Sequence, residues 1–126
     1  MNNKEIIDQV RIMCGTITLL DEGWHHFIYQ GIDYVNIPNV QDGMIRISIP
    51  NIGDTYFLEG RHLETVINET NREVKYVKAV ILENGSISLN YDHKIIGKEN
   101  AEEIVPHMIK ALSAASKHIL TKLQTR

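Results

Sequence analysis

The sequence predicts an α+β fold in which a five-stranded, mainly antiparallel sheet packs against three helices, in the order α-β-β-β-α-β-β-α. Three segments repeat apolar residues every three or four positions, as amphipathic helices do. Five shorter segments alternate apolar and polar residues, or are rich in β-branched and aromatic residues. Three of them precede the second helical segment and two follow it, without a helical pattern between neighbours. At 126 residues, without a repeat or a linker, the chain is expected to be a single domain over residues 1–126.

The first helix is expected over Asn3–Asp21. Asn2 and Glu5 have the spacing of a capping box at its start, and Gly23 suits the left-handed position beyond its end. One apolar stripe runs through it, made of Ile6, Val10, Met13, Ile17 and Leu20. The single cysteine, Cys14, lies on the same side, which favours a small buried side chain and excludes an internal disulfide.

Three strands are expected next, over Trp24–Gln30, Ile32–Ile37 and Met44–Ile49. Gln30-Gly31 marks a turn, and Pro38, which has no N–H, is expected to end the second strand. The third strand alternates cleanly, with three isoleucines facing inward: Ile45, Ile47 and Ile49. Three strands at this spacing favour an antiparallel meander.

Two further helices are expected, over Glu59–Glu73 and Ala101–Gln124. The second of these is the longest in the chain and begins at a capping box made of Asn100 and Glu103. Pro106 lies inside it, where a proline normally kinks a helix or delays its start. The expected helix nevertheless keeps one continuous apolar row: Ile104, Met108, Leu112, Ala115, Ile119 and Leu123.

Between these helices, Val74–Glu83 and Ser86–Asp92 read as a hairpin joined by Asn84-Gly85. This dipeptide favours a two-residue type I′ turn, which would place Val80 opposite Leu89. The first strand is then apolar on both faces, and its second face needs cover from its own chain or from another. The candidate partner or dimer surface on that second face is Val77, Ala79 and Ile81.

Composition excludes several classes of function. The formal net charge is −3 and no cluster of Lys and Arg stands out, so we expect no binding to nucleic acid or to an anionic membrane. No apolar run approaches the roughly 18 residues of a membrane span. The first residues lack the pattern of a signal peptide, and we therefore expect a cytoplasmic protein.

No motif for catalysis, metal binding or cofactor binding is apparent. His25 and His26 are adjacent in a strand, so their side chains point to opposite faces and cannot both bind one metal ion without a bulge. Metal motifs of the CxxC or HExxH type and glycine-rich phosphate loops are absent from the sequence. We expect no catalytic residue, no metal and no cofactor, and hence no enzyme.

In its second half, the sequence resembles the YbjN family of bacterial sensory transduction regulators and the wider type III secretion chaperone fold. The similar stretches are Ile67–Asn71, Lys75–Ala79, the turn at Glu83–Ser86, and Ile104–Ala115. The resemblance implies a small, often dimeric α/β protein that works by holding other proteins. It carries over no functional residue, because these stretches mark helix ends, strands and packing.

Two functional hypotheses follow. The first is a non-enzymatic protein-binding module, regulator- or chaperone-like, that binds a protein partner or a second copy of itself through an apolar sheet and helix surface. The second is a small-ligand-binding or enzyme domain, with a pocket lined by Trp24, Phe27, Tyr29 and the nearby histidines. A thermal-shift screen with metals, nucleotides and metabolites separates the two.

Overall fold

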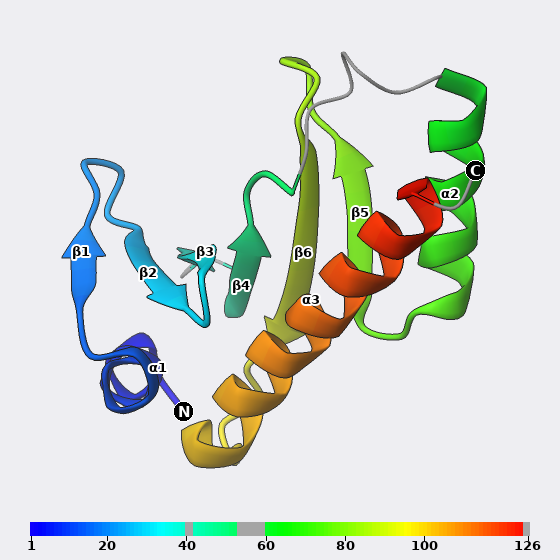
Figure 1. The fold of residues 1–126 in the computed structure, drawn as a ribbon. Coiled ribbons are helices and arrows are strands. Elements are labelled where there is room, and N and C mark those ends of the chain that lie inside the picture. The colour runs from blue at the N-terminus through cyan, green and yellow to red at the C-terminus, as the bar shows by residue number, and fades with distance from the viewer. Residues whose placement is uncertain (40–41, 53–59, 125–126) are drawn as a thin grey trace.

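A computed structural model describes residues 1–39, 42–52 and 60–124. In it, three helices cover one face of a six-stranded antiparallel sheet, whose strand order is β1-β2-β3-β4-β6-β5 (Figure 1). The elements are α1 (Asn3–Cys14), β1 (Ile17–Leu19), β2 (His25–Tyr29), β3 (Ile32–Asn39), β4 (Met44–Ile49), α2 (Gly60–Glu73), β5 (Val77–Ile81), β6 (Ile87–Lys94) and α3 (Ala101–Gln124). The predicted α+β class is confirmed, but the sheet has six strands instead of five.

The additional strand comes from the segment that the sequence assigned to the first helix. That helix was expected to reach Asp21, but α1 ends at Cys14, because Gly15 takes a φ of +81° and donates its N–H to Arg11. Ile17–Leu19 then pairs with β2 as the edge strand β1. The expected helix start is correct, since Asn2 Oδ1 accepts the N–H of Glu5 at 2.9 Å.

The meander of β2, β3 and β4 forms as expected, except at Pro38. Gln30 and Gly31 both have positive φ angles, of 51° and 79°, which is the geometry of a two-residue type I′ turn. The prediction that β3 ends before Pro38 is wrong, because β3 pairs with β4 as far as Asn39. The pairing of β3 with β2 ends at Asn36 of β3. Beyond that residue one side of β3 is an edge of the sheet, where a residue without an N–H is tolerated.

The β5–β6 hairpin has a longer loop than expected. Leu82 donates to the carbonyl of Ser86 at 2.8 Å, and Gly85 donates to the carbonyl of Leu82 at 2.9 Å. The loop therefore has three residues, with Gly85 alone in the left-handed region at a φ of 87°. The expected pairing of Val80 with Leu89 is wrong by one residue: Val80 lies opposite Ser88. A slip of one residue exchanges the two faces of the strand.

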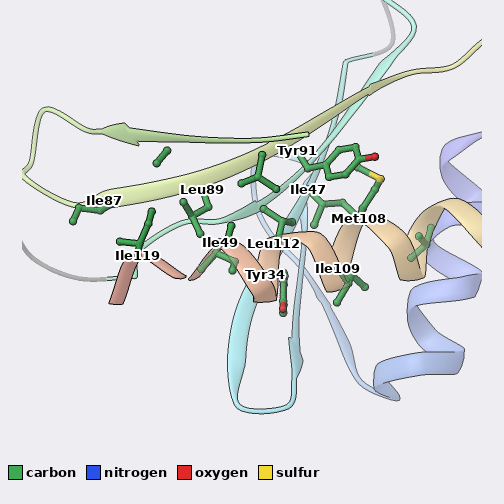
Figure 2. Packing of buried hydrophobic residues seen from close by; sticks show 14 of the residues in the cluster. Tyr34, Ile47, Ile49, Ile87, Leu89, Tyr91, Met108, Ile109, Leu112 and Ile119 are labelled. Atoms are coloured by element: carbon green, nitrogen blue, oxygen red, sulfur yellow. The ribbon is translucent and has the colours of Figure 1, made fainter. Parts of the chain in front are cut away.

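The core lies between the inner face of the sheet and α3. Figure 2 shows side chains of β4 and β6, including Ile47 and Leu89, directed toward Met108 and Leu112 of α3. All four are at most 1% exposed. Burial of a large apolar side chain contributes about 1.5–3 kcal/mol, which makes this layer the main stabilising contact of the fold. Pro106 lies inside α3 without ending it.

Candidate partner-binding surface

The sheet has an inner face covered by helices and an outer face on which no described helix packs. Buried apolar residues of α1, α2 and α3 join one cluster with side chains of the inner face, among them Phe27, Tyr34 and Ile45. Side chains at alternate positions of the strands point to the other face. This outer face is the first place to look for a binding surface.

The expected partner surface divides between core and surface. Because of the shifted register, Val77 and Ala79 lie on the inner face, opposite Tyr91 and Leu89, and each is 2% exposed within the chain itself. At these two positions, the strand face that was expected to need cover is therefore the core face, and the chain's own helices cover it. Ile81 lies in the same row but beyond the cover of the helices, and it is 44% exposed. A role of Ile81 in partner binding stays a prediction.

Three consecutive apolar residues, Val80, Ile81 and Leu82, are exposed at the end of the hairpin. Val80 is 38% exposed and Leu82 is 41% exposed, and both point to the outer face, whereas Ile81 points to the inner one. We call Val80, Ile81 and Leu82 the hairpin patch. A run of three exposed apolar residues lowers solubility without contributing to the core, so it is a defect unless it has a function.

The middle of the outer face is polar and pre-arranged. The Nε and Nη2 atoms of Arg46 donate to the two carboxylate oxygens of Asp92 at 2.7 and 3.0 Å. This two-pronged contact raises the pKa of Arg46 above its ordinary value, mainly through its hydrogen bonds. Next to it, Ser48 donates its hydroxyl hydrogen to Oδ1 of Asn90 at 2.6 Å. Arg46 and Asp92 line a hollow of about 330 Å³ with Ile37, Asn39, Asp42 and Met44.

An aromatic cluster joins the exposed Tyr76 to the buried Tyr91. Tyr76 is 65% exposed and takes a φ of 71°, which is unusual for a residue other than glycine. Its ring stacks on that of Tyr91 at a centroid distance of 5.7 Å, and His107 lies edge-on to both rings. The Tyr91 hydroxyl also lies 3.0 Å from Nδ1 of His107. These contacts hold the N-terminal end of β5 against α3.

Three solved structures are similar to this chain over almost its whole length. The chain matches no protein-family profile and no curated protein sequence. The crystal structure of the ExsC–ExsE complex contains a chain that is similar at a TM-score of 0.70 and 13% identity, covering 96% of this chain and 92% of that one. In the HopA1–SchA chaperone–effector complex the values are a TM-score of 0.65, 9% identity, and coverage of 97% and 92%.

The third structure is that of YbjN from E. coli, a proposed transcription regulator, with a TM-score of 0.62, 12% identity, and coverage of 96% and 90%. This is the fold of YbjN and of the type III secretion chaperones. The resemblance seen in the sequence is confirmed at the level of fold. At such identities, similarity of structure carries no residue and no partner across to this chain.

The residues expected to line a small-ligand pocket divide between the core and the two faces of the sheet. Phe27 is 1% exposed and stacks on Tyr34 at a centroid distance of 5.3 Å, so its ring belongs to the core. Trp24 and Tyr29 are half-buried. His26 points to the outer face, where Nε2 lies 2.8 Å from Oδ1 of Asp33, whereas His25 lies on the inner face. The alternating placement of the two histidines is confirmed.

Three further features concern metal binding, membrane spans and the single cysteine. Within the described ranges, no three His, Cys, Asp or Glu side chains lie close enough together to hold a metal ion. No helix there is long and apolar enough to cross a membrane. Cys14 is half-buried, and burial raises the pKa of its thiol, which makes it a poorer nucleophile at neutral pH.

Sequence reasoning missed the hairpin patch because it assumed the wrong loop length. The expected register places Val80 opposite Leu89, on the core face, although in the structure Val80 points away from that face. A sign of the longer loop was available: Glu83-Asn84-Gly85 ends in the glycine that a three-residue hairpin requires in the left-handed position.

Proposed function

We propose that this chain is a non-enzymatic, cytoplasmic protein-binding module, regulator- or chaperone-like, which holds an apolar segment of another polypeptide. The hairpin patch carries this proposal, because Val80, Ile81 and Leu82 are consecutive, large, apolar and each more than one-third exposed. Single exposed apolar residues are common on protein surfaces, whereas three of them in succession along one strand are unusual unless they serve a function.

The similar structures support the same class of function. Two of them are solved as complexes of two proteins, and one of these is described as a chaperone with its effector. The polar part of the outer face suits this role as well. Arg46 and Asp92 already satisfy each other, so a partner that covers them leaves no unpaired charge beneath it.

A second copy of the chain is the other occupant to consider. A twofold dimer would bring the same patch together from both copies, and Ile81 is the member of the expected dimer surface that remains accessible. We place the polypeptide partner first because the hairpin patch is short. Stable protein–protein interfaces bury about 1,200 Å² or more, which three side chains contribute only in part.

The test is a binding screen with matched variants. An array of immobilised peptides of unrelated sequence is probed with the purified chain, and the affinity of each bound peptide is then measured by calorimetry. In the test variant, serine replaces Val80, Ile81 and Leu82. In the control, serine replaces Ile12 and Ile96, which are each 78% exposed and lie outside the patch.

We expect the chain to bind apolar peptides, and the patch variant to bind them at least about tenfold more weakly than the control does. Equal binding by the two variants would rule out the hairpin patch. Absence of peptide binding, together with a clear thermal shift by a metal ion, nucleotide or metabolite, would favour the small-ligand alternative.

A further inference from the structure

The two edges of the sheet are not equivalent, and the difference begins with the backbone of β5. Leu82 donates to the carbonyl of Ser86, so these residues form a hydrogen-bonded pair. Such pairs alternate along an antiparallel ladder, which makes Ala79 and Leu89 a non-hydrogen-bonded pair. The N–H and C=O of Ala79 therefore point away from β6, toward the edge of the sheet.

A side chain of α2 occupies that edge. Oδ1 of Asn71 accepts the N–H of Ala79 at 2.7 Å, and Nδ2 of Asn71 donates to the C=O of Ala79 at 3.0 Å. A primary amide offers the same acceptor and donor that the backbone of a neighbouring strand would offer. In Figure 1, α2 lies alongside β5, beyond the last strand of the sheet.

The opposite edge has no such closure in the described part of the chain. Leu20 donates to the carbonyl of Trp24 at 2.8 Å, and the same alternation directs the backbone groups of Ile17 and Leu19 outward from β1. No described side chain bonds both outward groups of a β1 residue as Asn71 does on β5. The closure is thus specific to one edge.

We propose that Asn71 locks the β5 edge against pairing with the β5 strand of a second copy of this chain. An exposed strand edge is a template for association, and natural sheets commonly cover or interrupt it. Once α2 is released from this edge, two β5 strands can pair antiparallel about a twofold axis at Ala79, which places Val77 of one copy opposite Ile81 of the other. The exposed Ile81 and Leu82 extend this edge with apolar surface, and the lock opposes their association.

This lock is separate from the binding of a polypeptide at the hairpin patch, and its first test is amide hydrogen exchange. The test variants are Asn71→Ala, which removes both bonds, and Asn71→Asp, which keeps an acceptor but turns a charged oxygen toward the Ala79 carbonyl. The control is Asn68→Ala, an exposed residue of the same helix. We expect the Ala79 amide to exchange about tenfold faster in Asn71→Ala, faster by a smaller factor in Asn71→Asp, and at the wild-type rate in the control.

The second test measures association by light scattering over a range of concentrations. We expect Asn71→Ala to form a larger, concentration-dependent species than the wild type forms. A second change, Ile81→Lys, places a charge at the same edge and is expected to restore the wild-type size. The control Asn68→Ala keeps the wild-type size throughout.

Three results would overturn the lock. In the first, the Ala79 amide of both Asn71 variants exchanges as slowly as in the wild type. In the second, exchange accelerates but no larger species forms, which would make Asn71 a support of β5 only. In the third, circular dichroism shows both variants unfolded, which would assign Asn71 to the stability of the whole fold.

Discussion

Nε2 of His93 lies 2.6 Å from Oε2 of Glu99, and the Glu99 carboxylate also accepts the backbone N–H groups of Ile96 and Gly97 at 2.8 and 2.9 Å. Together these bonds fix the connection between β6 and α3. They lower the pKa of Glu99 from 4.5 to about 2, chiefly through the amide of Ile96, with His93 adding to the effect. The ionised carboxylate is thus a structural part of this connection.

The first prediction is that Glu99 contributes to stability in a pH-dependent way. A carboxylate whose pKa is lower in the folded than in the unfolded chain stabilises fully above the unfolded value, and this contribution disappears as the pH falls toward the folded value. Glu99→Gln should therefore lower the urea midpoint at pH 7. The difference from the wild type should shrink as the pH falls below about 4.5 and vanish near about 2.

The control is Glu83→Gln, which changes an exposed carboxylate in the hairpin loop. It should shift the urea midpoint little at any pH, because a surface substitution away from a specific contact changes stability by less than about 0.5 kcal/mol. A Glu99→Gln effect that stays constant from pH 7 to pH 3 would contradict the proposed role of the ionised carboxylate.

The second prediction separates the core and surface members of the expected partner surface. Ala79→Asp places a charge at a position that is 2% exposed beneath the helices, and we expect an unfolded or insoluble chain. Ile81→Asp changes a side chain that is 44% exposed, and we expect a folded chain with a cooperative thermal transition. A folded Ala79→Asp variant would show that β5 does not pack as described.

The sequence predicts the elements that local patterns determine, and it fails where contacts between distant segments decide the structure. β4 and α3 have the expected bounds, because each has one strong period and, for α3, a cap at Asn100 whose Oδ1 accepts the N–H of Glu102. β1 was missed because Ile17 and Leu20 continue the helical spacing of α1. The helix ends at Gly15 instead, and Ile17–Leu19 forms a strand because it pairs with β2. The local sequence pattern does not encode this pairing.

The candidate site was harder to predict than the fold. The sequence correctly indicates that β5 is apolar on both faces, but which face is exposed depends on a single residue of loop length. The contact between Asn71 and Ala79 could not be predicted from the sequence either, because it depends on how α2 lies against the edge of the sheet. The sequence shows only an asparagine near a helix end.

The third prediction concerns the turn that sets this register. Gly85 has a φ of 87°, where a Cβ atom is unfavourable, and the three-residue loop requires that conformation. Gly85→Ala should lower the free energy of unfolding by about 1 kcal/mol. Glu83→Ala in the same loop should have little effect. If the two variants unfold at the same urea concentration, the loop does not need a left-handed residue at position 85.

The fourth prediction concerns a buried amide. Asn36 is fully buried on β3, where it lies opposite His25 of β2 and Ile47 of β4. Neither Oδ1 nor Nδ2 of Asn36 has a hydrogen-bond partner among the described residues. Because a buried amide without a partner costs about 1–3 kcal/mol, Asn36→Val should leave the free energy of unfolding unchanged or raise it by up to about 2 kcal/mol.

Ser48→Ala is the matched comparison for Asn36→Val. Ser48 is also buried in the sheet, but it donates a hydrogen bond to Asn90 at 2.6 Å. Its loss should lower the free energy of unfolding by about 1 kcal/mol, as measured by urea denaturation at pH 7. The two variants should therefore move the urea midpoint in opposite directions, or only Ser48→Ala should lower it. A loss above about 1 kcal/mol in Asn36→Val would mean that the Asn36 amide is hydrogen-bonded in solution.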